Sequence, residues 1–132
     1  MTATLADEMT LHDIARAARG AWDRDTCDPD DLAAWRPGNP ARGQCGVTAL
    51  LVHDLFGGDL VLGTVRVGGA LRGFHWWNVL PGEVEVDLTR EQFGPHEVVG
   101  EAQRIGRPAG DPRRCLEQYR LFRERVLAAV GR

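Results

Sequence analysis

The chain has 132 residues, of which 43% are apolar and 27% charged, and its net charge is −3. This length and composition predict a single domain with its own core over residues 1–132. The lack of a basic excess argues against a nucleic-acid partner and against binding to an anionic membrane surface.

The first ten residues contain neither the basic start nor the apolar run of a secretory leader. The longest apolar stretches, such as residues 47–52, are far shorter than the roughly 20 residues that cross a bilayer. Three cysteines, an odd number, favour a reducing compartment over a disulfide framework. We therefore expect a cytoplasmic protein without a membrane partner.

The first predicted element is a helix over residues 11–22. Thr10 is a suitable N-cap, Asp13 stands at the capping-box position, and apolar residues recur at helical spacing. A loop rich in proline and glycine follows over residues 27–40, with Trp35 as its one large apolar side chain.

Residues 43–56 are predicted to form a loop that leads into a buried apolar helix. The pair Gly57-Gly58 ends this helix, because glycine adopts the left-handed conformation common at helix C-termini. Cys45 is therefore expected at the helix N-terminus or within two residues of it.

Strands are predicted next over residues 60–67, 71–80, 83–88 and 98–105, separated by Gly- and Pro-containing turns. A final helix is predicted to open at Asp111-Pro112, with aspartate as the cap and proline in the first turn. The expected fold class is α+β, with helices packed on a small antiparallel sheet.

Cys45, His75 and Asp87 form the constellation that carries chemistry. His75 and Asp87 lie on two strands joined by the turn at residues 81–82, which predicts that they are near neighbours across the hairpin. A carboxylate in that position would fix the tautomer and orientation of the imidazole.

A cysteine attacks as its thiolate, and an unperturbed thiol has a pKa of about 8.5. The helix N-terminus and a nearby imidazolium are expected to lower the pKa of Cys45. Backbone N–H groups of the helix and the Gln44 side chain are expected to stabilise an oxyanion, and Gly43 and Gly46 to leave room for an acyl group.

Three segments surround these residues: GQCGVTA at 43–49, HWWNVL at 75–80 and DLTREQF at 87–93. Together they resemble the YunG-type family of small bacterial proteins, over roughly residues 30–95. More distantly, a helix-initial cysteine followed by a strand histidine and a strand aspartate is similar to the papain/transglutaminase-like cysteine enzymes.

That second resemblance implies a papain/transglutaminase-like fold with N-terminal helices, a nucleophile-bearing helix packed on a small antiparallel sheet, and a C-terminal helix. It implies that Cys45 is the nucleophile, His75 the general base and acid, and Asp87 the residue that orients His75.

Other groups are expected to play supporting roles. Trp76 and Trp77 should point to opposite faces of their strand, and Trp77 and Trp35 are candidate walls of a substrate groove. Cys27 lies in an acidic loop, and Cys115 falls on the predicted apolar face of the last helix. No pair of cysteines or histidines has the spacing of zinc ligands, so no metal or other cofactor is expected.

The leading hypothesis is a cysteine-dependent acyl-transfer enzyme whose partner is a small molecule or peptide with an electrophilic carbonyl. The alternatives are a non-catalytic domain that binds a peptide or metabolite in the same groove, and an accessory subunit that acts only with another protein.

Overall fold

The computed structural model describes residues 9–131; residues 1–8, which include most of the segment searched for a leader, and residue 132 lie outside it. The fold is α+β, as predicted. Within residues 9–131, no helix is both long enough and apolar enough to cross a membrane. The main elements are α2 (Leu11–Ala21), α3 (Cys45–Phe56), β1 (Asp59–Val67), β2 (Ala70–Leu80), β3 (Val84–Val86), β4 (Glu97–Ile105) and α4 (Leu116–Ala129); the short 3₁₀ helices are η1 (Arg24–Thr26), η2 (Pro29–Ala34) and η3 (Arg90–Gln92).

Both predicted N-terminal helices are confirmed. Thr10 caps α2 and forms the predicted capping box with Asp13. Helix α3 begins at Cys45 and ends where Gly57 takes a left-handed φ of 83°. Its residues are apolar on nearly every side, which is typical of a helix that is covered by neighbours all round.

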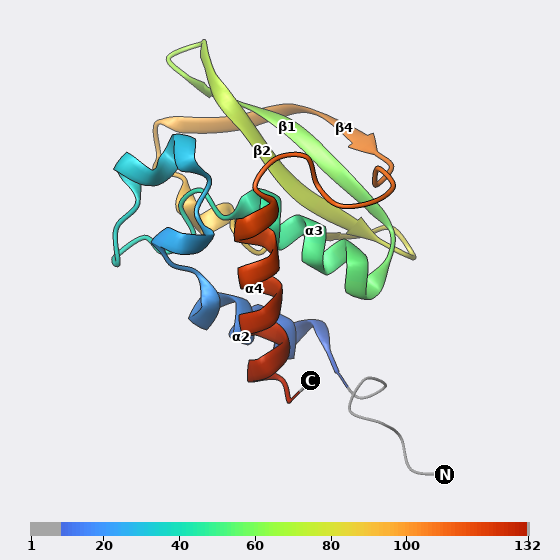
Figure 1. Cartoon of the computed structure of the whole chain (residues 1–132). Coiled ribbons are helices and arrows are strands. Elements are labelled where there is room, and N and C mark those ends of the chain that lie inside the picture. The colour runs from blue at the N-terminus through green and yellow to red at the C-terminus, as the bar shows by residue number, and fades with distance from the viewer. Residues whose placement is uncertain (1–8, 132) are drawn as a thin grey trace.

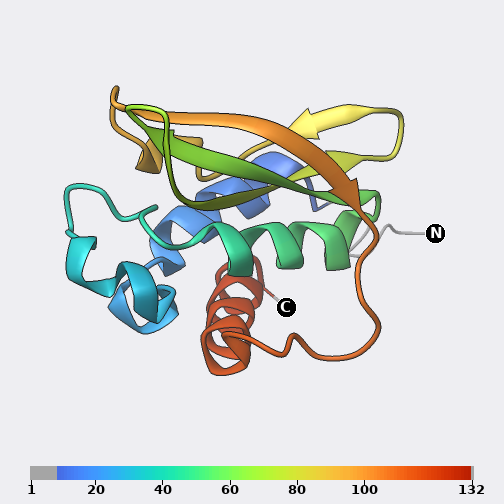
Figure 2. The ribbon, with the colours of Figure 1, turned by 90° about the horizontal axis from the view of Figure 1, so that it is seen from above.

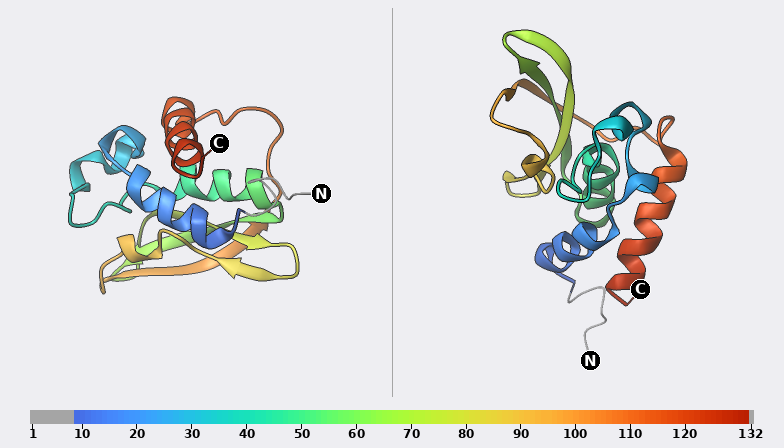
Figure 3. Two further views of the ribbon diagram at one scale, coloured as in Figure 1. Left: turned by 90° about the horizontal axis from the view of Figure 1, so that it is seen from below. Right: turned by 90° about the vertical axis from the view of Figure 1, so that its left-hand side faces the viewer.

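The four strands form one antiparallel sheet in the order β3-β2-β1-β4. Figures 1 and 2 show α3 packed beneath this sheet, with α2 beside it and α4 crossing on the side away from the strands. The right-hand view of Figure 3 shows how strongly the sheet curves. The core between the helices consists of Ile14, Ala18, Ala21, Trp22, Ala41, Val47, Leu51, Val52, Tyr119, Phe122 and Val126.

The third strand is shorter than the predicted range of 83–88. It ends at Val86, because the Asp87 carboxylate accepts the Thr89 backbone N–H at 3.3 Å and turns the chain. Asp87 therefore follows the strand, at the start of the turn that leads to η3.

The prediction that the last helix opens at Asp111-Pro112 is wrong. Helix α4 begins at Leu116. The preceding residue, Cys115, has a left-handed φ of 60°, and this change of backbone direction separates the helix from residues 111–114. The Asp111 carboxylate instead accepts a hydrogen bond from Arg120 at 3.1 Å. Cys115 is therefore at the helix cap, half-buried against the core, and not within the apolar face of the helix.

Phe122 is fully buried in the helical core, so we expect Phe122→Ala to lower the free energy of unfolding by about 3–5 kcal/mol. Phe74 is 57% exposed on β2, and the matched change Phe74→Ala should cost within about 0.5 kcal/mol. Urea unfolding followed by circular dichroism measures both. Equal losses in the two variants would contradict this placement of the core.

Candidate active site

A buried hydrogen bond fixes α3 against β2: the Asn78 side-chain amide donates to the Ala49 carbonyl at 2.9 Å. Cys45 lies four residues before Ala49, about 6 Å along a helix, and Trp76 lies two residues before Asn78, about 6.6 Å along a strand. Because the distance from Ala49 back to Cys45 is close to that from Asn78 back to Trp76, Cys45, the first residue of α3, lies next to Trp76. The Trp76 backbone lies beside the Cys45 thiol and acts to lower its pKa.

His75 and Asp87 are in direct contact, as the sequence predicted. The His75 Nε2 atom lies 2.7 Å from the Asp87 Oδ2 atom. Asn78 is paired with Val86, so the contact is diagonal and not directly across the hairpin. Because an ionised carboxylate only accepts hydrogen bonds, this contact assigns the proton of the neutral ring to Nε2 and leaves Nδ1 as an acceptor.

Two groups that the sequence analysis missed support Asp87. The Arg90 Nε atom donates to Asp87 Oδ2 at 2.6 Å, and the Thr89 backbone N–H donates to Oδ1. Burial acts to raise the pKa of Asp87, but the hydrogen bonds from His75 and Arg90 outweigh it and hold that pKa below its usual value. The spacing of three residues between Asp87 and Arg90 was the sequence signal for this ion pair.

Aromatic side chains surround His75, which is fully buried. The Trp77 ring stacks on it with 5.3 Å between centroids, and Phe93 meets it edge-on at 4.8 Å. Among the described residues, the buried His75 Nδ1 atom has no hydrogen-bond partner. A buried ring nitrogen without a partner is costly and calls for an explanation, of which a catalytic role is one.

The pKa of Cys45 is raised, and the sequence analysis predicted that it would be lowered. Burial raises the pKa of Cys45 to about 12, the Trp76 backbone opposes this, and the charges of Asp31 and Asp87 add to the rise. Within residues 9–131, no hydrogen bond joins its sulfur to His75. The resting residue is therefore a neutral thiol next to the His75–Trp76 peptide, not a thiolate paired with an imidazolium.

The neighbours of Cys45 divide into structural and accessible groups. Gln44 is fully buried, and its amide accepts from Thr26 at 2.7 Å and donates to the Asp23 carbonyl at 2.9 Å. These bonds give it a structural role in place of the expected oxyanion contact. Gly46, in contrast, is exposed, and a Cβ there would meet nothing within 4 Å, so the space beside this residue of α3 is open.

Gly43 does not leave room for an acyl group, contrary to expectation. Its φ is 73°, and an added Cβ would lie 2.4 Å from the Cys27 sulfur and 2.8 Å from the Asp31 Cβ. This glycine is required by the close approach of Cys27 and by its backbone conformation.

The two tryptophans named as groove walls are buried. Trp77 is 5% exposed, and its indole donates to Glu85 at 3.1 Å. Trp35 is 7% exposed and donates to the Pro40 carbonyl at 3.1 Å. In this structure neither presents an open face to a substrate; Trp77 acts on the site through its contact with His75.

A metal centre does not emerge from the geometry either. In the part of the chain that the structure describes, no group of three or more histidine, cysteine, aspartate or glutamate side chains is placed to hold a metal ion. Cys27 is buried and donates to the backbone carbonyls of Asp28 and Arg42, which accounts for its position.

Comparison with known proteins gives a family but no fold relative. A family model described as "YunG protein" matches residues 10–131. The chain is also 42% identical over 59 residues to "Uncharacterized protein YunG" of Bacillus subtilis (strain 168). That match spans 45% of this chain and 46% of the relative, so it covers about half of each protein. No solved structure matches the chain significantly.

The raised pKa predicts that Cys45 reacts slowly with iodoacetamide. At pH 8 we expect its alkylation rate to be at least about tenfold below that of a free cysteine, because the thiolate fraction falls tenfold for each unit that the pKa rises. Peptide mass spectrometry measures the rate at each cysteine. Rapid modification of Cys45 below pH 7 would contradict the neutral resting thiol.

Asp87 links stability to pH. Its pKa is lowered by folding, so its contribution is complete above the unfolded-state pKa of about 4 and is lost as the pH falls through the folded-state value. We expect Asp87→Asn to lower the free energy of unfolding by about 1–3 kcal/mol at pH 7. The difference in this free energy between the variant and the native protein should become smaller below about pH 4. Urea unfolding at both pH values measures it. A difference in unfolding free energy that does not change with pH would contradict this role of Asp87.

Proposed function

The chain belongs to the YunG family, and we propose that it is a cysteine-dependent acyl-transfer enzyme that forms an acyl-thioester on Cys45. Neither the family description nor the relative's printed name states a reaction, so the proposal rests on the site. The observation that carries it is the state of His75 among the described residues: Nε2 is bound to Asp87, Nδ1 is buried without a partner, and the next residue along the strand, Trp76, has its backbone beside the Cys45 thiol.

In the proposed reaction the Cys45 sulfur attacks the carbonyl carbon of an amide, ester or thioester as its proton passes to His75 Nδ1. Asp87 stabilises the imidazolium that forms. Collapse of the tetrahedral intermediate breaks the bond to the leaving group, which takes the proton from His75. Water or an amine then attacks the acyl-thioester, transfers its own proton through His75, and restores the thiol.

The start of α3 supplies donors for the oxyanion. Among the described residues, the backbone N–H groups of Cys45 and Gly46 have no partner, and α3 has no side-chain cap. Such groups at a helix N-terminus point toward an approaching anion. They act in place of Gln44, whose amide is engaged elsewhere.

The raised pKa of Cys45 determines how the nucleophile is activated. A thiol with a pKa of about 12 holds its proton at neutral pH, so sulfur attack requires a base in the same step. We propose that a bound carbonyl group brings the thiol and His75 Nδ1 together and that proton transfer accompanies attack. This is general-base catalysis and differs from a mechanism that starts from a preformed ion pair.

The fold that we propose is a short papain/transglutaminase-like domain. Helix α3 carries Cys45 as its first residue and packs on β2, the strand that carries His75. We place the protein in the cytoplasm, since three free cysteines suit a reducing compartment.

The second candidate is a non-catalytic domain that binds a peptide or metabolite at the same place. The raised pKa of Cys45 favours it, because a nucleophilic cysteine usually has a lowered pKa. The buried hydrogen bond between His75 and Asp87 would then serve stability alone.

We expect p-nitrophenyl acetate to acetylate the native protein on Cys45, detected by peptide mass spectrometry together with release of nitrophenol. Cys45→Ala should abolish the adduct, and His75→Gln should slow its formation by about 10²–10⁴-fold, the usual contribution of a general base. Cys115→Ala is the matched control and should react like the native protein, because Cys115 lies at the cap of α4. Absence of a Cys45 adduct, or equal rates with and without His75, would favour the binding domain.

A further inference from the structure

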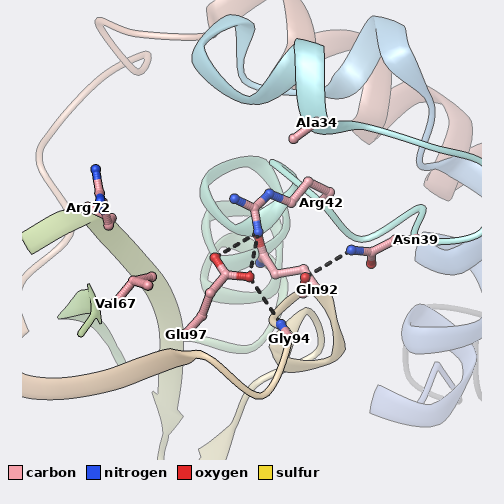
Figure 4. Close-up of a pocket in the computed structure, with 8 residues that line it drawn as sticks. All are labelled: Ala34, Asn39, Arg42, Val67, Arg72, Gln92, Gly94 and Glu97. Atoms are coloured by element: carbon pink, nitrogen blue, oxygen red, sulfur yellow. Dashed lines mark hydrogen bonds and ion pairs between the residues drawn. The ribbon is translucent and has the colours of Figure 1, made fainter. Parts of the chain in front are cut away.

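A second feature of the molecule is an open cleft of about 530 Å³ between the loop that precedes α3 and the ends of β1 and β4. Figure 4 shows it, and its lining includes Asn39, Arg42, Val67, Arg72, Gln92 and Glu97. This volume lies within the roughly 300–1,000 Å³ of small-molecule sites. The cleft therefore has room for a small organic ligand.

The cleft is joined to the candidate active site by short contacts. Its floor residue Gln92 accepts the Gly43 backbone N–H at 3.2 Å, two residues before Cys45. The residue after Gln92 is Phe93, whose ring meets His75 at 4.8 Å. The cleft thus borders the segment that leads into Cys45 and the segment whose Phe93 contacts His75.

Arg42 is held rigidly in this cleft. Its Nη1 atom donates to both Glu97 carboxylate oxygens at 3.0 and 2.9 Å, and its Nε atom lies 3.6 Å from Asp31. Within residues 9–131, its Nη2 atom has no hydrogen-bond partner, and Figure 4 shows it on the side of the guanidinium that faces Arg72. The fixed guanidinium presents an unused donor to the open space.

Arg72 supplies the charge that is not neutralised. It is exposed at the end of β2 nearest the hairpin turn, and it makes no ion pair with any described residue. Three charged residues line the cleft, Arg42, Arg72 and Glu97. Arg42 is balanced by Glu97 and by Asp31, so Arg72 is the lining cation that has no carboxylate partner among the described residues. Such a cleft matches a single negative charge, and the side chains of Ala34 and Val67 match a short carbon chain.

We infer that this cleft recognises a carboxylate on the acyl substrate, with Arg72 as the mobile cation and Arg42 as the fixed donor. The inference rests on the proposed acyl transfer and names its substrate class: small carbonyl compounds whose acyl part also carries one carboxylate. Arginine suits this task because its planar donors match the geometry of a carboxylate.

A pair of esters with the same leaving group tests the inference. We expect mono-p-nitrophenyl succinate, which carries a carboxylate, to acylate Cys45 about tenfold faster than p-nitrophenyl acetate, the effect of one charged hydrogen bond. In Arg72→Gln the ratio of the two rates should fall close to one. Arg113→Gln is the matched control, because Arg113 is exposed on the loop before α4, and it should keep the native ratio.

The outcomes separate this inference from the proposed function. If both esters acylate Cys45 at equal rates, the acyl-transfer proposal stands and the carboxylate site is overturned. If neither acylates Cys45, the acyl-transfer proposal fails, and binding of monomethyl succinate, followed by NMR of the arginine Nε–H groups, decides about the anion site. Saturable shifts at Arg72 that are absent at Arg113 would support it, and no shift would overturn it.

Discussion

The hydrogen bond from Asn78 to the Ala49 carbonyl is the contact on which the geometry of the site depends. It joins the middle of α3 to β2 inside the protein, where an unsatisfied amide would cost about 1–3 kcal/mol. Because four helical residues and two strand residues span similar lengths, this one contact brings Cys45 to Trp76. A shift of β2 by one residue would turn Asn78 away from the helix and move His75 to the opposite face.

In the mechanism that we propose, a well-oriented base acts together with a nucleophile that is not activated in the resting state. Asp87, supported by Arg90, holds the imidazole in one orientation, whereas burial and nearby carboxylates keep Cys45 protonated. A protein with this arrangement is protected against indiscriminate alkylation and oxidation, because the thiolate is the reactive form. Reactivity would then depend on a ligand that displaces water and brings sulfur and imidazole together. The adjoining cleft at Arg42 is where we propose that such a ligand is held.

Local signals in the sequence were sufficient for the α+β class, the start of α3 at Cys45 and the contact between His75 and Asp87. The capping box of Thr10, the glycines after α3 and the alternation in β2 act over a few residues. The prediction for the start of α4 was wrong because the Asp111 carboxylate accepts a hydrogen bond from Arg120, nine residues away, and does not cap the helix. The pKa of Cys45 and the structural role of Gln44 could not be predicted, since each depends on burial by segments distant in the chain.

Gly43 has a consequence for how mutational data on this protein should be interpreted. Any side chain at that position collides with Cys27 and strains the backbone two residues before Cys45. A saturation screen scored by the proposed activity would therefore rank Gly43 beside Cys45, although the glycine takes no part in the proposed bond making. Scoring cellular abundance in parallel would separate the two, because substitutions at Gly43 should deplete the folded protein. Conservative substitutions at Cys45, at the partly open start of α3, should leave its abundance nearly intact.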